Sequence, residues 1–564
     1  MNKKTIPIGI EFYKQIIDKD YYYVDKTLLV KELLDNTASV TLFTRPRRFG
    51  KTLALNMLKT FLEDERDSQG NRVDNHRYFE GKQITGCGEK YMGKLGQYPV
   101  INLSLKCAKQ PNFEMAYRTL QNEIREEFRR HQYVCENSSL NADEKLQFKQ
   151  IMAGEAVSAD YATALSFLSR CLKKYHNKNV IILIDEYDVP LENAYFAKFY
   201  DQMIAFIRSL FESALKTNEN LEFAAITGCL RISRESIFTG LNNLEVNTVL
   251  NEDFADTFGF TQPEVDRMLS DYGITDKKDE LKEWYDGYLF GETEVYNPWS
   301  VINYVKNASG HPHALPKPYW SNTSSNSIVK DLIENSDFVT KKEIEKLIAG
   351  GTIEKPVHED ITYEDIYSSQ DNLWNFLFFT GYLKKISERM DKRLHYLTMA
   401  VPNEEICSIY ENSVLSWFDK QVKKMEFSSF TKAIEDRNCD AFGEFLSARL
   451  LETISFYDYA ESYYHGFLVG LLKAMNKYEV VSNRESGNGR PDIIMKAPSL
   501  RGKAFIMELK VAKSFQTMED TVAEAVRQAV EQNYRAELEQ EGYSDITVYG
   551  ICFYKKECLV QTGH

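Results

Sequence analysis

Residues 39–52 read SVTLFTRPRRFGKT, a short apolar run followed by a loop that ends in Gly-Lys-Thr, and residues 53–62 continue with helical spacing. A strand, a loop and a helix in this order are typical of a phosphate-binding loop. In such a loop, backbone N–H groups face the phosphates, a lysine reaches the β- and γ-phosphates and a hydroxyl contacts magnesium. We therefore expect this segment to bind ATP and Mg²⁺, with Thr52 on the metal and the nucleotide held by Arg48, Phe49, Gly50, Lys51 and Thr52.

The loop departs from the general motif at its start, because Arg45 stands where the first glycine usually lies. Arg45, Arg47 and Arg48 form a basic run. Their side chains could contact phosphates of ATP or of a nucleic acid, or they could cover the domain surface through salt bridges. The sequence leaves these interpretations open.

A second motif lies at residues 180–186, where the run VIILI is apolar at every position and is followed by Asp185 and Glu186. Such a run is typical of a parallel strand that is buried on both faces. Its acidic end predicts the other half of an ATPase site, with Asp185 holding magnesium and Glu186 acting as the general base. A buried strand that merely ends in a solvated acidic turn is the alternative, but the two motifs together favour ATP binding.

Further strand candidates at 99–105 and 223–227 alternate with helical patterns around 113–130, 161–175 and 198–216, which predicts a parallel α/β sheet. The strand at 99–105 lies between the two motifs, as expected for the additional-strand class of P-loop ATPases. At the end of the next strand, Thr227 is placed to contact the γ-phosphate or the attacking water. Arg231 and Arg234 follow and could stabilise transition-state charge, although ordinary surface arginines would look the same.

The C-terminal section has helical spacing at 461–475, strand candidates at 478–482, 492–496 and 503–509, a long helix at about 517–538 and a strand at 545–554. A hairpin of the second and third strands would bring Asp492 and Glu508 together, with Lys510 on the same face as Glu508. Phosphodiester hydrolysis needs carboxylates that hold a divalent metal and a group that assists the water. We therefore predict that Asp492 and Glu508 bind Mg²⁺, or Mn²⁺ in its place, with catalytic help from Lys510.

Other side chains around this section are weaker candidates. The Leu509 carbonyl and Glu461 could add metal ligands, and Gln528 and Tyr534 could contact the substrate backbone. His465 shares a helix face with Glu461, but a histidine there is more often a satisfied core residue, so we leave it out of the catalytic set. Charged residues at a strand exit are also often only solvated, and the order of elements is what makes the nuclease interpretation specific.

At this point a family resemblance becomes visible. The segments IGIEFYKQII, YYYVDKTLLVKELL, FTRPRRFGKT, VIILIDEYDVP and ITGCLRIS resemble the AAA-ATPase-like family of bacteria, and YYHGFLVGLL, VVSNRESGNGRPDIIM and FIMELK resemble the PD-(D/E)XK nuclease domain that follows the ATPase in that family. The resemblance implies an α/β protein whose P-loop has the RPRRFGK form and whose nuclease signature is Asp492, Glu508 and Lys510. The expected domains are an ATPase at 1–250, a mainly helical lid or linker at 251–425 with a short hairpin at 383–399, and a nuclease-like α/β domain at 426–564.

The composition of the chain further limits the classes of function and the compartment that we expect. The formal net charge of −14 argues against a broad basic surface for non-specific nucleic-acid binding, though not against a local groove. The nine cysteines are scattered without zinc-site spacing, which indicates a reducing compartment. No signal peptide or membrane span is recognisable, so we expect a cytoplasmic protein with no membrane partner.

Two hypotheses follow from these motifs. The first is an ATP-regulated, metal-dependent nuclease that acts on DNA in preference to RNA. The second is a non-catalytic, nucleotide-dependent switch whose nuclease-like domain only binds nucleic acid or a protein partner. The sequence leaves the oligomeric state open, and a homo-oligomer is compatible with both hypotheses.

Overall fold

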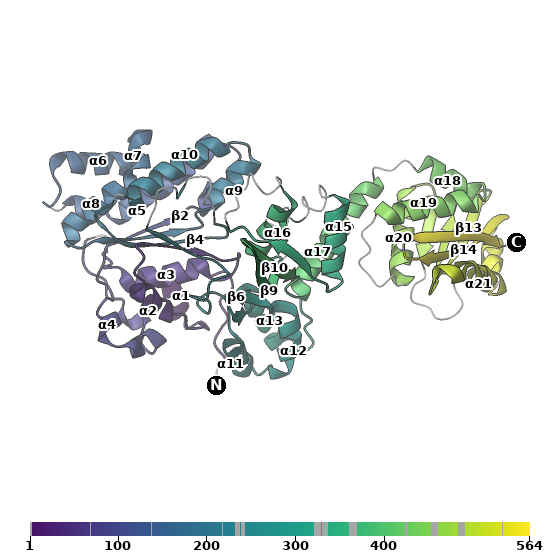
Figure 1. The fold of residues 1–564 in the computed structure, drawn as a ribbon, viewed down its shortest axis with the longest axis horizontal. Helices are drawn as coiled ribbons and strands as arrows, with labels where there is room; N and C mark the ends of the chain where they lie inside the picture. Colours follow the sequence, from purple (N-terminus) through teal and green to yellow (C-terminus); the bar gives the residue numbers. More distant parts are fainter. Residues whose placement is uncertain are drawn as a thin grey trace. The chain divides into compact units, whose positions relative to one another are not determined.

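A computed structural model describes residues 3–563, apart from 68, 137, 217, 232–236, 239–242, 321–328, 330–336, 360–368, 424–426, 453–460, 483–490 and 533. The chain forms two compact units (Figure 1). The first comprises Met1–Thr323 with Thr352–Cys407, and the second comprises Ser324–Gly351 with Ser408–His564. The three domains expected from the sequence are a different division of the chain and stay a prediction.

The first unit is built on a parallel sheet, as the sequence predicted. Its strands run in the order β2-β3-β4-β1-β5, and every neighbouring pair is parallel. The strands are β1 (Val40–Thr44), β2 (Val100–Ser104), β3 (Val180–Asp185), β4 (Leu221–Gly228) and β5 (Leu244–Asn247). The order of the strands in the sheet was not predicted: β2 lies at the sheet edge, and β4 is the strand inserted between β1 and β3. That arrangement still defines the additional-strand class, and it places the ends of β1, β4 and β3 side by side.

Helices cover both faces of this sheet (Figure 1). On one face lie α1 (Tyr13–Asp18), α2 (Leu28–Asp35) and α3 (Lys51–Leu62), and on the other lie α5 (Phe113–Arg130), α8 (Ala164–His176) and α10 (Tyr200–Phe211). Helix α8 shows why such segments pack here: Leu165, Leu168 and Leu172 recur at helical spacing and are fully buried. Because apolar helix faces cover both sides, β3 is buried along its whole length.

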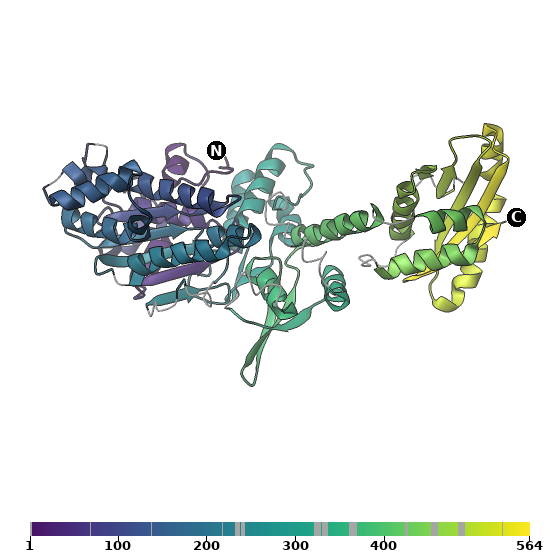
Figure 2. The same ribbon diagram turned by 90° about the horizontal axis from the view of Figure 1, so that it is seen from above.

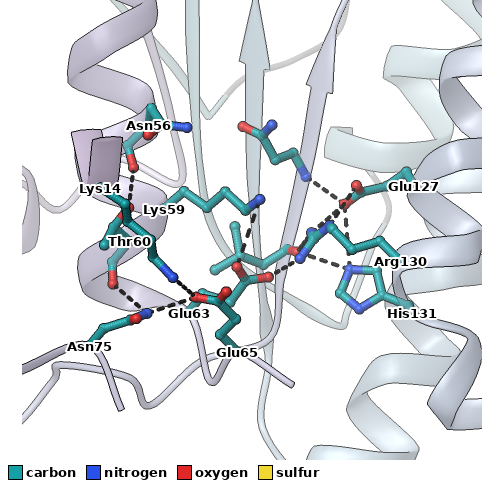
Figure 3. Close-up of polar contacts among 12 residues, drawn as sticks. Lys14, Asn56, Lys59, Thr60, Glu63, Glu65, Asn75, Glu127, Arg130 and His131 are labelled. Atoms are coloured by element: carbon teal, nitrogen blue, oxygen red, sulfur yellow. Dashed lines mark hydrogen bonds and ion pairs between the residues drawn. The ribbon is translucent and has the colours of Figure 1, made fainter. Parts of the chain in front are cut away.

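An ion-pair network with buried carboxylates fixes the end of α3 that lies away from the phosphate loop (Figure 3). Arg130 on α5 pairs with Glu63, which follows α3, and with Glu127 at 2.6 Å. It also donates to the Val100 carbonyl at 2.6 Å, where β2 begins. The two carboxylates raise the pKa of Arg130 against the opposing effect of its burial. The network therefore ties α3, α5 and β2 together, and α3 carries the loop residues at its other end.

The rest of the first unit is a smaller helical and β region. It contains α11 (Gln262–Tyr272), α12 (Lys278–Tyr285), the hairpin of β6 (Tyr288–Phe290) and β7 (Thr293–Val295), α13 (Pro298–Gly310) and α16 (Gln370–Phe379). The expected hairpin at 383–399 is present as β9 (Lys384–Asp391) and β10 (Leu394–Ala400), which Figure 2 shows as a narrow two-stranded ribbon. The sequence did not predict β8 (Ile353–Pro356), which pairs with β10.

The second unit contains a mixed sheet in the order β11-β12-β13-β14-β15. Its strands are β11 (Glu479–Ser482), β12 (Ile493–Lys496), β13 (Lys503–Val511), β14 (Asp545–Tyr554) and β15 (Glu557–Gly563). Only β13 and β14 pair in parallel. The predicted order of one helix, three strands, a helix and a strand is confirmed. The predicted long helix is two helices, α21 (Met518–Glu531) and α22 (Tyr534–Glu541), and β15 is an addition.

Alternating residues of β13 enter two different cores of this second unit. Phe505, Met507 and Leu509 pack with the helices α18 (Ser428–Glu435), α19 (Cys439–Glu452) and α20 (Glu461–Ala474). Ala504 and Ile506 pack on the opposite face with residues of α21 and α22. The two-residue period of a strand therefore directs Glu508 and Lys510 towards α21. This unit also contains α15 (Phe338–Ile348) and the part of α17 (Glu404–Lys423) from Ser408 onwards.

Candidate nucleotide site and candidate nuclease site

The loop after β1 has the backbone of a phosphate cradle. Gly50 adopts a left-handed conformation with φ of +86° directly before α3, and a Cβ placed there would have no atom within 4 Å. Only glycine takes up that conformation without strain. The first N–H groups of α3 have no acceptor within the helix and carry the positive end of the helix dipole. The loop therefore has room for an anion and the donors to bind it.

Lys51 lies over this loop. Its ammonium is buried and donates to the carbonyl oxygens of Arg45 and Pro46, both at 2.8 Å. Neutral carbonyl groups compensate a buried cation less well than an anion does. A phosphate held by the loop would supply that negative charge.

Three of the predicted site residues meet at Asp185. Its Oδ2 accepts a hydrogen bond from the Thr52 hydroxyl at 2.6 Å, and its Oδ1 accepts one from the Thr227 hydroxyl at 2.5 Å. The three side chains come from α3, β3 and β4, which the sheet order brings together. Hydroxyl and carboxylate oxygens are the ligands that Mg²⁺ prefers, so the residues present fit a magnesium ion.

Glu186 follows Asp185 with φ of +52°, so its side chain leaves the strand direction. Burial raises the pKa of the Glu186 carboxyl, and the neighbouring Asp185 charge raises it further. A carboxylate with a raised pKa is a better proton acceptor than a solvated one, which suits a general base. Asp188, two residues on, is also buried and accepts the N–H of Cys229 at 2.7 Å, which fixes the turn after β4. Asp188 was not predicted from the sequence, although the acidic turn DEYD was the available signal.

The structure separates the three arginines of the basic run. Arg45 is fully buried and its guanidinium contacts the carbonyl and side-chain oxygens of Asn247 at 2.8 and 2.5 Å. Burial lowers the pKa of Arg45 to about 9. Arg47 forms an ion pair with Glu192, and Arg48 lies over the Trp299 ring at 4.1 Å from its centroid. Of the open interpretations, contacts within the protein therefore account for all three side chains, and a nucleotide contact of Arg48 stays a prediction.

Two other predicted positions are placed less directly. The Phe49 ring is buried against Tyr288 and Phe290 of the β6–β7 hairpin, with centroid distances of 5.0 and 5.2 Å, so only its backbone faces the loop. Arg231 pairs with Glu359 at 3.3 Å. Arg234 lies outside the described residues. Roles for these residues in catalysis or nucleotide binding stay predictions.

In the second unit, the three signature residues lie close together. Asp492 directly precedes β12, and its Oδ2 accepts the N–H of Leu509 at 2.8 Å. Leu509 stands between Glu508 and Lys510 on β13, so this bond brings the two carboxylates to one place. Glu508 is buried and accepts a hydrogen bond from Gln528 on α21 at 2.5 Å. The predicted hairpin geometry is therefore present.

Contacts around these carboxylates extend the site. Burial raises the pKa of the Tyr534 phenol, and the charges of Glu508 and Asp492 raise it further, so both carboxylates lie near this ring. Lys510 pairs with Glu524 on α21 at 3.2 Å. The sequence analysis did not single out Glu524, and its position four residues before Gln528, on the same helix face, was the available signal.

The weaker candidates are placed as follows. The His465 ring contacts the Asp492 carbonyl and the Ser482 hydroxyl, both at 3.2 Å, which supports its exclusion from the catalytic set. Glu461 begins α20, but its side chain lies outside the described residues. Among the described residues, no group of three or more His, Cys, Asp or Glu side chains could hold a metal. The candidate ligands are therefore two carboxylates and the Leu509 carbonyl, an all-oxygen set that fits Mg²⁺ or Mn²⁺.

Within the part of the chain that the structure describes, no helix has the length and apolar character needed to cross a membrane. The nine cysteines are all free thiols.

The two segments of the chain that contain these candidate sites match models of known protein families. Residues 7–238 match the family model of the predicted AAA-ATPases, and residues 459–563 match that of the PD-(D/E)XK nuclease superfamily. The chain is also 25% identical over 335 residues to a protein of Azotobacter chroococcum mcd 1 described as an uncharacterized protein in the vnfD 5′ region. That match covers 59% of this chain and 57% of the relative. The chain thus contains a domain of the AAA-ATPase-like family followed by a domain of the PD-(D/E)XK nuclease superfamily.

Proposed function

We propose that this protein binds and hydrolyses ATP at the site after β1 and cleaves DNA at the site on β12 and β13, in the cytoplasm. The observation that carries the first activity is the convergence of Thr52 and Thr227 on Asp185. The second activity is supported by the bond that holds Asp492 beside Glu508 and Lys510. Membership of the two families supports an ATPase combined with a nuclease-like domain.

At the nucleotide site, the loop N–H groups and Lys51 would hold the phosphates. Thr52 and Asp185 would hold Mg²⁺, which supplies charge neutralisation at the phosphates when bound. Glu186 would orient the attacking water and accept its proton, which its raised pKa favours. Thr227 would fix the Asp185 carboxylate in place.

At the nuclease site, Asp492 and Glu508 would bind Mg²⁺ or Mn²⁺, which supplies charge stabilisation at the scissile phosphate. Lys510 would orient the water or stabilise the developing charge. Gln528 holds the Glu508 carboxylate, and Tyr534 lies near both acidic residues. We propose that ATP binding controls this cleavage, so that the first site regulates the second.

A non-catalytic switch is the second candidate. It is favoured by the net charge of −14 and by the pairing of Lys510 with Glu524, which occupies the ammonium in this structure. In that case the second unit would bind nucleic acid or a protein without cutting it. Calorimetry would show no Mg²⁺ or Mn²⁺ binding that depends on Asp492 and Glu508.

A cleavage assay tests the leading proposal. Linear and circular DNA would be incubated with Mg²⁺ or Mn²⁺, with and without ATP. The wild type would be compared with Lys510→Ala and with Lys513→Ala, an exposed lysine three residues on that serves as the matched control. Cleavage should disappear in Lys510→Ala alone. If the wild type cleaves DNA with neither metal, the non-catalytic switch is the better account. If Lys51→Ala cleaves DNA equally with and without ATP, and as fast as the wild type does with ATP, control by ATP is refuted.

A further inference from the structure

A lysine that the two motifs do not include lies at the same edge of the sheet as Asp185 and Glu186. Ser104, the last residue of β2, pairs with Asp185 of β3, and the next residue, Leu105, donates its N–H to the Asp185 carbonyl at 3.0 Å. Lys106 follows directly. The register therefore places Lys106 beside the carboxyl end of β3, where the acidic pair leaves the strand.

The Lys106 ammonium is engaged by an acidic residue from the N-terminal segment. Its Nζ lies 2.8 Å from Oε1 of Glu11, and the two side chains are 54% and 49% exposed. Glu11 stands two residues before α1, far from Lys106 in the sequence. An ion pair this exposed contributes little to stability, so its loss costs the fold little.

The charges around this pair face the acidic end of β3. The pKa of Lys106 is raised, first by its hydrogen bond to Glu11 and then by the charges of Glu186 and Asp185. Arg48 of the phosphate loop is also within the electrostatic reach of Glu11 and Glu186. Glu11 therefore lies between cations of two different elements at the edge of the candidate nucleotide site.

The order of the phosphates decides which nucleotide reaches Lys106. The loop N–H groups and Lys51 would hold the phosphates at the start of α3, whereas the terminal phosphate of a triphosphate extends towards the acidic end of β3. A diphosphate lacks the group that extends that far. A cation at the end of β2 would then interact with a triphosphate and leave a diphosphate almost unaffected.

We propose that Lys106 is a specificity-determining contact for the terminal phosphate of a nucleoside triphosphate, and that Glu11 competes with this phosphate for the ammonium. The inference rests on the proposed nucleotide site. In the absence of a triphosphate, Glu11 neutralises Lys106; when a triphosphate binds, its terminal phosphate displaces Glu11. The N-terminal segment around Glu11 would thereby distinguish the two nucleotide states.

Equilibrium binding tests this inference without relying on turnover. The full chain would be titrated with fluorescent ATP and ADP analogues in Mg²⁺, as wild type, Lys106→Met, Glu11→Gln and the double variant. Lys178→Met is the matched control, because Lys178 is an exposed lysine at the opposite end of β3. Circular dichroism would verify that each variant is folded, and the exposed positions of both residues favour this.

The expected result has three parts. Lys106→Met weakens ATP binding about tenfold, the cost of one charge-assisted hydrogen bond, and leaves ADP binding unchanged. Glu11→Gln strengthens ATP binding about threefold, as expected for removing an exposed competing charge. In the double variant the effect of Glu11→Gln disappears, since the group for which it competes is gone.

The outcomes that overturn the inference differ from those that overturn the proposed site. If the wild type binds ATP but Lys106→Met weakens the binding of ATP and ADP equally, or weakens neither, Lys106 does not contact the terminal phosphate. If Glu11→Gln changes the affinity for ATP equally in the wild type and in the Lys106→Met variant, Glu11 does not compete with the phosphate for Lys106. Failure of the wild type to bind either nucleotide would overturn the nucleotide site itself, and the inference with it.

Discussion

Glu405, at the start of α17, is a buried carboxyl whose ionisation should make the first unit pH-sensitive. The side chain is fully buried and accepts hydrogen bonds from the Ser300 hydroxyl at 2.7 Å and from the Trp320 N–H at 2.8 Å. Burial raises the pKa of Glu405 from 4.5 to about 7, against the opposing effect of these hydrogen bonds. The desolvation of the charged form therefore outweighs the donors that are present.

The sign and size of the effect follow from that shift. Below pH 4.5 the carboxyl is protonated in both the folded and the unfolded chain. Between pH 4.5 and 7 the unfolded chain loses the proton first, so the free energy of unfolding falls as the pH rises, and above pH 7 the loss is complete. A shift of this size corresponds to about 3 kcal/mol. Glu405→Gln keeps the hydrogen-bonding shape without the charge, so it should stabilise the first unit by up to about 3 kcal/mol at pH 8 and by only about 1 kcal/mol at pH 5.

Guanidinium unfolding followed by tryptophan fluorescence measures this difference. Four of the five tryptophans, at positions 284, 299, 320 and 374, belong to the first unit, so the signal reports mainly on that unit. Glu404→Gln is the matched control, because the neighbouring glutamate is exposed. A constant offset between wild type and Glu405→Gln from pH 5 to 8, or the same pH dependence in Glu404→Gln, would refute the reasoning.

Three further substitutions test the packing of the first unit, two of them near the candidate nucleotide site and one at the far end of α3. Arg45→Met leaves the buried oxygens of Asn247 without their donor and should lower the free energy of unfolding of the first unit by about 3 kcal/mol, measured by the same fluorescence assay. Gly228→Ala would place a Cβ 2.4 Å from the Tyr187 ring, so ATP binding should weaken in titrations while the second unit keeps its circular dichroism. Glu127→Gln removes one of the two carboxylates that pair with the half-buried Arg130 guanidinium and should cost about 2 kcal/mol in the same unfolding assay, whereas an unchanged midpoint would show that this ion pair is dispensable.

Local patterns predicted most of the elements that carry the two sites. The buried run of β3 and the strand, loop and helix around Gly50 were recognisable because a parallel strand is apolar throughout and a phosphate loop needs a glycine at one position. The spatial order of strands was not recognisable, since β4 enters between β1 and β3 through pairing that no local pattern encodes. The edge strands β5 and β15 were also missed, because both are only partly buried, and β5 has only four residues, so the alternating pattern is weak.

The site residues divide in the same way. Asp185, Glu508 and Lys510 follow from motifs, whereas the orientation of a side chain depends on partners that are distant in sequence. Arg45 illustrates this. Its place beside Arg47 in a loop would allow a phosphate contact. In the structure, however, the oxygens of Asn247, 202 positions away in the sequence, accept hydrogen bonds from the Arg45 guanidinium inside the core. The structure therefore places Arg45 in the scaffold of the loop, a role that the sequence motif left open.

The two sites allow regulation to be separated from independent activity. Each unit encloses its own hydrophobic core, around β3 in one and around β13 in the other, so a substitution at one site leaves the packing of the other intact. A change in DNA cleavage caused by Lys51→Ala would then require a signal between the units and not a folding defect. Conversely, if nucleotide binding and DNA binding respond only to substitutions in their own units, the two sites share a chain without being coupled, because the coupling free energy between two binding sites acts in both directions.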